Sequence, residues 1–470
     1  MTATDALDHP LTGRVRGPVS RPGDGGYDKE RAGFQTAQCH RPSLIVGATG
    51  AADVSAAVML AAETGQPVAV QATGHGLATP AEDGVLITTC RMNGVRVDAE
   101  SRTAWIAAGV RWNRVIHEAA PFGLAPLSGS SPDVGAVSYT LGGGLGLLSR
   151  EFGYAADHVR AIDVVTADGR IRRVVPGDDL YWALLGGRDN FGVVTGMEID
   201  LMPVDRIYGG ALHFDADLVE DVLHTYLSWT ATVPDELTSS VGLMPMPDLP
   251  MVPVPLRGRY VASVRVVYHG DSASGERLIA PLRAIGPRLV DSLAEMPYRA
   301  AASIYNDPVT PHAYHGDGLL LHDVDAETLR MVRGHTGPDA PVMCVVGLNH
   351  LGGALARPPA TPNAIGHRSA RYLLRILSPL DGTDATTTVR SVHRRVSDAL
   401  GSAIVGRSLN FVFGSHGEVT PGGYEPADYR RLTELKAAYD PENLFRLNRN
   451  IPPATGRRDP GMSSLSGQAC

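Results

Sequence analysis

The chain has 470 residues, of which 43% are hydrophobic and 20% are charged, and its formal net charge is -8. This length allows two or more domains with a large buried core. Lysines and arginines are spread among the acidic residues and form no basic stripe, so nucleic acid is not expected as a partner.

The cysteines and the N-terminus indicate the compartment in which the protein works. Cys39, Cys90, Cys344 and Cys470 lie far apart, which favours reduced thiols over a disulfide framework. Residues 1–10 lack a basic segment followed by an apolar one, and no stretch approaches the ~18 uninterrupted apolar residues of a membrane span. We therefore expect a soluble protein of the cytoplasm that does not enter a membrane.

The N-terminal half predicts an arm followed by mixed helices and strands. Residues 1–28 are rich in Gly, Pro, Arg and Asp and lack apolar periodicity, so they are predicted to form a flexible arm. The apolar spacing predicts a helix over Ala51–Thr64 and, after Gly65, a strand at Val68–Val70. The pattern then predicts strands at 84–89, 94–97 and 102–108, a helix at 112–120, and a hairpin at 161–175 with the turn Asp168-Gly169.

From about Ile207 the pattern changes to long alternating strands, such as Tyr260–Tyr268, with helical stretches such as 274–285 between them. Alternation with one polar face predicts an antiparallel sheet whose open side walls a substrate cavity. We therefore divide the chain into the arm 1–28, a first domain 29–206, a second domain 207–415, a segment 416–455 that packs back on the first domain, and a tail 456–470.

A histidine between glycines ends the first domain's apolar run. Residues 66–76 finish in Thr73-Gly74-His75-Gly76, where backbone amides can approach a ligand without interference from Cβ atoms. Taken alone, such a histidine is more often a loop residue bonded to the backbone.

Four segments in order resemble the berberine-bridge-enzyme-like flavin oxidases of the vanillyl-alcohol-oxidase superfamily, including its 6-hydroxynicotine-oxidase-like and natural-product oxidases. They are 41–45 with 52–54 and the strand into 74–76, then 129–146, then 179–195, and finally 429–432 through 439–445 to 448–452. The resemblance implies an α+β, two-domain PCMH-type FAD-binding fold. In it, 29–206 binds FAD, and 207–415 binds substrate on an antiparallel sheet covered by helices.

The resemblance also implies how FAD is held. His75 matches the histidine that bonds covalently to the flavin, and Ser131 replaces the cysteine that makes a second bond, so one covalent bond is expected. Gln71, Thr73 and Arg188-Asp189 depart from the family's usual residues. The other residues expected to contact the cofactor are Thr73, Gly74, Gly76, Ser130, Ser131, Asp133, Val134, Gly135, Gly142, Gly143, Gly144, Asn190, Gly192, Val194 and Asn448.

The glycine cluster at 141–146 has a second interpretation. Its G-G-G-x-G pattern differs from the dinucleotide-binding G-x-G-x-x-G. Close packing of a helix on a sheet explains such glycines as well as amides that grip a pyrophosphate.

Catalysis by a flavin needs a base that takes the substrate's O–H or N–H proton. The candidates are Glu418, Tyr424, Tyr429 and Tyr139, each of which is about as well explained as a solvated loop side chain or a packed core tyrosine. His350 and His416 are candidate substrate contacts, and a structural role is the alternative for each. No metal site is indicated, because no histidine pair or carboxylate companion stands at ligand spacing.

These expectations add up to an FAD-linked oxidase. It would oxidise a C–H bond next to O or N of a small molecule, such as a secondary-metabolite intermediate, and reduce O2 to H2O2 as a monomer or homodimer. Val134, small at a position linked to oxygen access in the family, favours an oxidase over a dehydrogenase. The alternatives are a redox-neutral cyclase that retains its flavin, a non-catalytic flavin-binding protein and a nicotinamide-dependent dehydrogenase.

Overall fold

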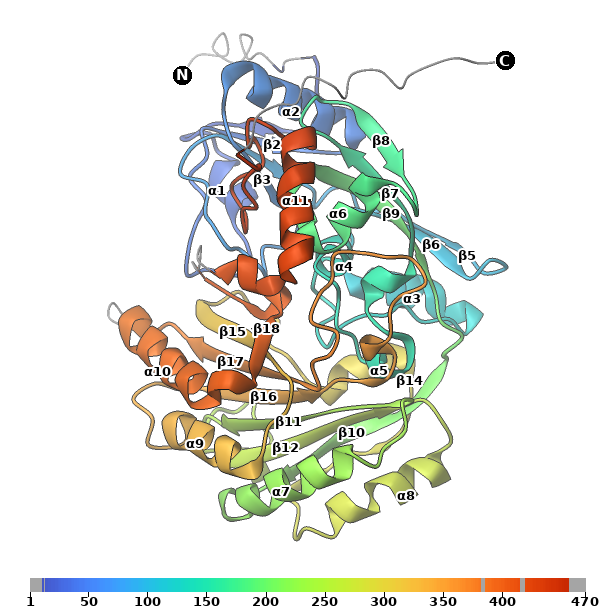
Figure 1. The fold of residues 1–470 in the computed structure, drawn as a ribbon, viewed down its shortest axis with the longest axis vertical. Coiled ribbons are helices and arrows are strands. Elements are labelled where there is room, and N and C mark those ends of the chain that lie inside the picture. The colour runs from blue at the N-terminus through green and yellow to red at the C-terminus, as the bar shows by residue number, and fades with distance from the viewer. Residues whose placement is uncertain (1–10, 12, 382–384, 415–418, 456–470) are drawn as a thin grey trace.

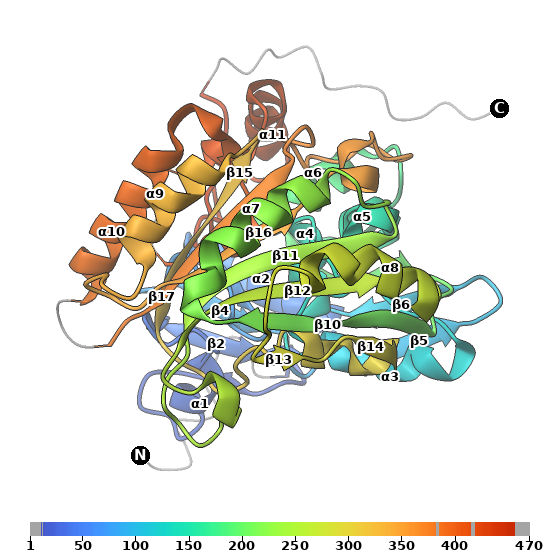
Figure 2. The ribbon, with the colours of Figure 1, turned by 90° about the horizontal axis from the view of Figure 1, so that it is seen from below.

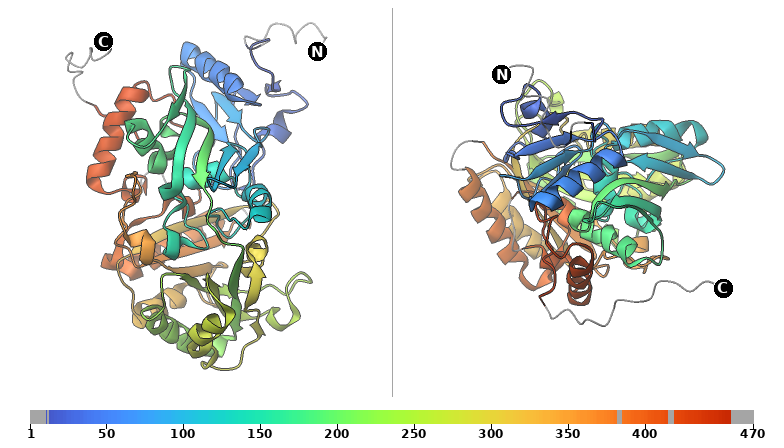
Figure 3. Two further views of the ribbon diagram at one scale, coloured as in Figure 1. Left: turned by 90° about the vertical axis from the view of Figure 1, so that its right-hand side faces the viewer. Right: turned by 90° about the horizontal axis from the view of Figure 1, so that it is seen from above.

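The computed structural model describes residues 11, 13–381, 385–414 and 419–455. Three sheets form two regions, and the α+β fold agrees with the expectation from sequence (Figure 1). Seen from the side, a four-stranded and a five-stranded sheet lie together at one end of the molecule, and a nine-stranded sheet lies at the other (Figure 3).

The four-stranded sheet carries the strand that ends at the glycine-flanked histidine. Its order is β1 (Val19–Ser20), β2 (Leu44–Gly47), β4 (Val85–Thr88) and β3 (Val68–Gln71), with α1 (Tyr27–Arg31) nearby. Strands β2 and β3 both run parallel to β4, and α2 (Ala51–Thr64) connects them. Helix α2 has the predicted bounds because Gly65 ends it in the left-handed conformation and donates its N–H to the last carbonyls.

The five-stranded sheet is antiparallel. Its order is β5 (Val95–Asp98), β6 (Thr103–Ala107), β9 (Val193–Asp200), β7 (Val159–Val165) and β8 (Ile171–Val174). The predicted hairpin at Asp168-Gly169 is confirmed, since β7 pairs with β8 across that turn. The helices of this part are α3 (Trp112–Ala119), α4 (Ala136–Leu141), α5 (Ser149–Phe152) and α6 (Asp179–Gly187).

The nine-stranded sheet is also antiparallel and separates two environments. Its order is β13 (Val290–Asp291), β10 (Arg206–Phe214), β12 (Tyr260–Tyr268), β11 (Leu237–Pro245), β16 (Val345–His350), β17 (Tyr372–Pro379), β15 (Tyr314–Leu321) and β18 (Ile404–Arg407), and β14 (Ala294–Pro297) pairs with β10. The helices that cover one face are α7 (Val219–Thr230), α8 (Ser272–Arg283), α9 (Ala326–Thr336) and α10 (Ala385–Leu400), as Figure 2 shows. The other face turns toward the first region.

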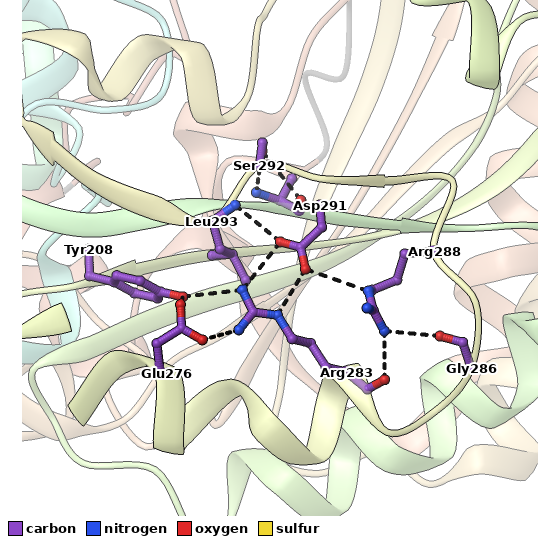
Figure 4. A network of polar contacts seen from close by, with 9 residues as sticks. Tyr208, Glu276, Arg283, Gly286, Arg288, Asp291, Ser292 and Leu293 are labelled. Atoms are coloured by element: carbon purple, nitrogen blue, oxygen red, sulfur yellow. Dashed lines mark hydrogen bonds and ion pairs between the residues drawn. The ribbon is translucent and has the colours of Figure 1, made fainter. Parts of the chain in front are cut away.

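An ionic network fastens α8 to the edge of this sheet (Figure 4). Arg283 donates to Asp291 at 2.8 Å and also to Glu276, which accepts the Tyr208 hydroxyl at 2.6 Å. Arg288 donates to the carbonyl of Arg283 at 2.7 Å. The end of the helix is therefore tied to the short strand β13.

The C-terminal segment packs against the first region. Helix α11 (Pro426–Tyr439) lies beside α6, and Val68 of β3 donates its N–H to the carbonyl of Leu444 at 3.0 Å (Figure 1). Lys436 is fully buried, ion-paired with Asp440 at 2.7 Å, and donates to the carbonyl of Asn190 at 2.7 Å. The boundaries between the arm, the two domains, the C-terminal segment and the tail remain a prediction. Over the described ranges, no helix is both long and apolar enough to cross a bilayer.

Candidate active site

A cavity of about 490 Å³ lies between the first region and the face of the nine-stranded sheet that helices α7 to α10 leave uncovered. Its volume is within the range of roughly 300–1,000 Å³ typical of small-molecule sites. One wall comes from the loop after β3, the loop at 129–131 and residues 447–449, and the other from β11, β12, β16 and β17.

The loop after β3 is held in place by residues 33–35. Phe34 and Gln35 donate their N–H groups to the carbonyls of Thr73 and Gly74, both at 3.0 Å. Gly74 has φ of +71°, and a Cβ there would lie 2.5 Å from the Cα of Gly33. Only glycine fits this close approach of two backbones, which fixes the position of the next residue, His75.

His75 lines the cavity as a neutral, partly satisfied imidazole. The Phe34 ring stacks on it with centroids 3.9 Å apart, and its Nδ1 lies 2.8 Å from Thr73 Oγ1. Its Nε2 is buried without a hydrogen-bond partner in the described part of the chain. Burial, helped by the charge of Arg111, lowers the pKa of His75 to about 4. A neutral imidazole with one unused nitrogen suits a covalent bond to a ligand better than a cationic one.

The same loop presents unused backbone donors. Residues 73–79, 130 and 131 all line the cavity. Within the described residues, none of their amide N–H groups donates a hydrogen bond to the backbone. Because unpaired N–H groups in a row attract anions, this wall fits a pyrophosphate.

Three more predicted cofactor contacts, Val134, Val194 and Asn448, also lie in the lining. Asn448 Oδ1 is buried without a partner among the described residues. Ser130 donates its hydroxyl to Asp307 at 2.6 Å, and this bond joins the two walls. The side-chain oxygen of Asn448, the backbone N–H groups of the loop after β3 and the imidazole of His75 therefore all line the same cavity.

The glycine cluster reaches the cavity only at its ends, through Leu141, Leu145 and Gly146. Gly142, Gly143 and Gly144 are not in the lining. A Cβ at Gly142 would lie 2.0 Å from Asn410 Oδ1, and one at Gly144 would lie 2.5 Å from the Tyr139 ring. Gly142 and Gly144 make room for the side chains of Asn410 and Tyr139, which favours close packing as the reason for these glycines.

Four other predicted cofactor contacts are likewise absent from the lining, and their neighbours explain why. Asn190 donates to the carbonyls of Gly187 at 2.8 Å and Arg449 at 3.1 Å and accepts from the N–H of Ile451 at 2.8 Å, so its amide ties the C-terminal segment down. Asp133 accepts from Arg111 at 3.3 Å. Gly135 precedes α4, and Gly192 lies against β7, where a Cβ would be 2.6 Å from the carbonyl oxygen of Val165.

The structure does not bring Tyr424 and Tyr429 to the cavity, because the start of α11 packs toward α6. Tyr424 donates its hydroxyl to the carbonyl of Gly186 at 3.0 Å, and the Tyr429 ring stacks on it with centroids 5.9 Å apart. Burial raises the pKa of both tyrosines. Glu418 and His416 lie outside the described residues.

Tyr139 does line the cavity, beside the Trp112 ring. Its hydroxyl is buried without a partner in the described chain, and burial raises the pKa of Tyr139 well above 10. A hydroxyl of this kind stays protonated and can donate a hydrogen bond, but it is a poor base.

His350 lies at the end of β16 in the opposite wall. Arg150 Nη1 lies 3.1 Å from its Nε2, and because arginine only donates, Nε2 must accept. The ring proton therefore sits on Nδ1, which has no partner among the described residues. Burial and the charge of Arg150 lower the pKa of His350 to about 3. His350 is thus a neutral N–H donor and not a proton acceptor.

Two cavity residues, Arg265 and Arg375, are not among the predicted site residues. Each is the one charged residue of its strand, β12 and β17 respectively. A charge in the middle of a buried strand is the sequence signal that would have found them.

Comparison with known proteins identifies the family. Residues 42–174 match the "FAD binding domain" family, and residues 409–452 match the "Berberine and berberine like" family. The (R)-6-hydroxynicotine oxidase of Paenarthrobacter nicotinovorans is 30% identical over 93% of this chain and 97% of its own length. The chain is a berberine-bridge-enzyme-like FAD-linked oxidase.

Solved structures and further relatives agree with this family. The 6-hydroxy-D-nicotine oxidase from Arthrobacter nicotinovorans superposes with a TM-score of 0.83 at 25% identity, over 95% of this oxidase and 100% of that chain. The chitooligosaccharide oxidase of Gibberella zeae is 24% identical over 96% of this chain and 95% of its own length. In the described part of this oxidase, no group of three or more His, Cys, Asp or Glu side chains could hold a metal ion.

Proposed function

We propose that this oxidase removes a hydride from a C–H bond next to O or N of a small molecule, such as a secondary-metabolite intermediate, and passes the electrons to O2 to give H2O2. The observation that carries the proposal is the neutral His75, stacked on Phe34 in the loop after β3, whose amides donate to no backbone carbonyl among the described residues. When bound, FAD would supply the hydride acceptor and the route of electrons to oxygen. In this proposal the protein acts in the cytoplasm as a monomer or homodimer.

The residues of the first wall suit FAD. The amides of 73–79 and of Ser130 and Ser131 would hold the pyrophosphate, and His75 would form the covalent bond. Ser131 carries no thiol, so the proposal includes one covalent bond only.

The described residues of the site orient the substrate by donating hydrogen bonds. His350 offers its Nδ1–H and Tyr139 its hydroxyl, and both are buried without another partner in the described chain. Neither is suited to accept a proton, for the reasons given above. Glu418 remains the proposed base, because a carboxylate can take the proton that these donors cannot.

The covalent bond is tested by acid precipitation of the purified protein. Yellow colour should remain in the pellet of the wild type and wash out of His75→Ala. His312→Ala is the matched control, because His312 also contacts the Phe34 ring and lines the cavity. Colour that washes out of the wild type would refute the covalent bond, and protein without any flavin would refute the proposed function.

Anaerobic mixing with candidate amines and alcohols tests the redox step. A substrate should bleach the yellow colour, and air should restore it with one peroxide formed per flavin. A product formed without bleaching would identify the redox-neutral cyclase instead. Retained flavin with neither bleaching nor product across the panel would favour a binding protein.

A further inference from the structure

Two arginines line the cavity on the wall formed by β11, β12, β16 and β17. Arg265 belongs to β12 and Arg375 to β17, and two strands, β11 and β16, lie between them. Their neighbours on the same strands, Val264, Val266 and Leu374, belong to the core beneath the helices and are absent from the cavity lining. Strand alternation therefore places both guanidinium groups on the cavity face.

Two glycines lie between the two arginines on this face of the sheet. Gly242 of β11 pairs directly with Gly347 of β16. A Cβ at Gly242 would lie 2.7 Å from Arg265 Nη1, and a Cβ at Gly347 would lie 3.5 Å from Arg375 Nη2. Both guanidinium groups thus lie over one pair of glycines, and larger residues there would displace them.

Neither guanidinium forms a direct ion pair with another described residue. In the described part of the chain, no carboxylate lies within 4.0 Å of Arg265 or Arg375. Three carboxylates line the same cavity, Asp189, Asp307 and Asp317. Asp317 is paired with Arg407, whereas Asp307 accepts the Ser130 hydroxyl and attracts Arg265 from beyond ion-pair distance. The Nε atoms of both arginines are buried without a partner among the described residues.

Aromatic rings support the two groups from one side. Arg265 lies 5.0 Å from the Tyr305 ring centroid and Arg375 lies 4.9 Å from that of Phe411. Stacking of this kind contacts the face of the guanidinium and leaves its in-plane N–H groups for another partner. Burial lowers the pKa of Arg265, Tyr305 and Asp307 act against that shift, and the nearby charge of Arg375 adds to it.

We propose that Arg265 and Arg375 together bind an anionic group of the substrate, a carboxylate, so that the oxidised molecule is a small organic acid. Buried charges in proteins are normally paired, and the fork of N–H groups on each arginine matches a carboxylate in two-point contact. The inference rests on the proposed function and adds to it the chemical class of the substrate. The aromatic rings stack on both guanidinium groups, and Gly242 and Gly347 leave the space that these groups occupy.

Calorimetric titration of the flavin-loaded protein tests the anion site without any turnover. Benzoate, benzamide and benzylamine share one ring and differ in charge, so they serve as probes. Wild type should bind benzoate at least tenfold more tightly than benzamide and benzylamine least of all, because a hydrogen-bonded charge is worth about tenfold or more.

Arg265→Gln and Arg375→Gln should each lose most of this preference for benzoate. Arg394→Gln is the matched control, since it removes one positive charge from the exposed surface of α10 and should leave the preference unchanged. Should either Gln variant fail to fold, Arg265→Lys and Arg375→Lys keep the charge and should retain a preference for benzoate.

Three results would overturn the inference. Equal binding of benzoate and benzamide by the wild type is the first, and a preference that survives in both Gln variants is the second. The third is a shifted flavin spectrum in the variants with the benzoate preference intact, which would assign the arginines to the flavin ring. Protein that holds no flavin would refute the proposed function itself, whereas yellow protein without the preference refutes the anion site alone.

Discussion

Gly74→Ala is expected to displace the loop that carries His75. The φ of +71° alone costs an alanine about 1–2 kcal/mol. Its Cβ would lie 2.5 Å from the Cα of Gly33, which is about 1 Å inside ordinary carbon contact. Overpacking of this kind adds about 1–3 kcal/mol, so the total loss is about 3 kcal/mol.

The displacement has a functional consequence as well as a cost in stability. Gly33 leads directly into Phe34, whose N–H bonds to Thr73 and whose ring stacks on His75. If the loop moves by about 1 Å, acid-stable flavin should form roughly a hundredfold more slowly, which is the usual effect of such a misplacement.

Gly65→Ala is the matched control for this experiment. Gly65 has φ of +67°, but a Cβ there would meet nothing within 4 Å, so the variant carries the backbone cost only. Thermal unfolding followed by tryptophan fluorescence should show a clearly larger fall in midpoint for Gly74→Ala, and acid precipitation should show lost colour for it alone. Equal midpoints and full colour in both variants would refute the steric reasoning.

Three further predictions concern the buried pair, the tyrosines and pH. Lys436→Met leaves Asp440 buried without its cation and should cost about 3 kcal/mol, measured as a fall in thermal midpoint. Tyr429→Phe should leave the rate of flavin reduction within about twofold in stopped-flow measurements, because the ring is outside the cavity lining. Burial lowers the pKa of His40 to about 4, below the unfolded value of 6.5, so its contribution to stability is complete above pH 6.5 and is lost as pH falls toward 4. His40→Gln should therefore flatten the acid side of a plot of midpoint against pH, by up to about 3 kcal/mol.

Each of these predictions has a control or a contradicting result. Arg446→Met removes an exposed charge near the buried pair, and a midpoint shift equal to that of Lys436→Met would contradict the first. A hundredfold slower reduction would return Tyr429 to the candidate bases. His322→Gln replaces an exposed histidine, and the same flattening there would show that burial is not the cause.

Local periodicity and residues that end a helix, such as Gly65, were enough to predict much of the fold. Helix α2 and strand β12 have the predicted bounds, because Gly65 ends the first and strict alternation defines the second. The α+β architecture followed from the family resemblance. The order of the nine strands did not, since it depends on pairings such as β11 with β16 that link distant parts of the chain.

The candidate site was predictable where one short segment makes it, as in the loop from Thr73 to Gly76. Gly144 shows the limit, because sequence does not tell whether a glycine makes room for a ligand or for a side chain such as Tyr139. The role of Asn190 was hidden for a similar reason, since its partners Arg449 and Ile451 lie about 260 residues away.

The bonds of Asn190 to Ile451 and of Val68 to Leu444 decide when the molecule is completed during synthesis. On the ribosome, the nine-stranded sheet can assemble while the first region still waits for the last tenth of the polypeptide. We therefore expect FAD to be captured only after the whole chain has been synthesised. We expect a chain that ends shortly after residue 425 to form the nine-stranded sheet but to leave the first region without the contacts of Leu444 and Ile451.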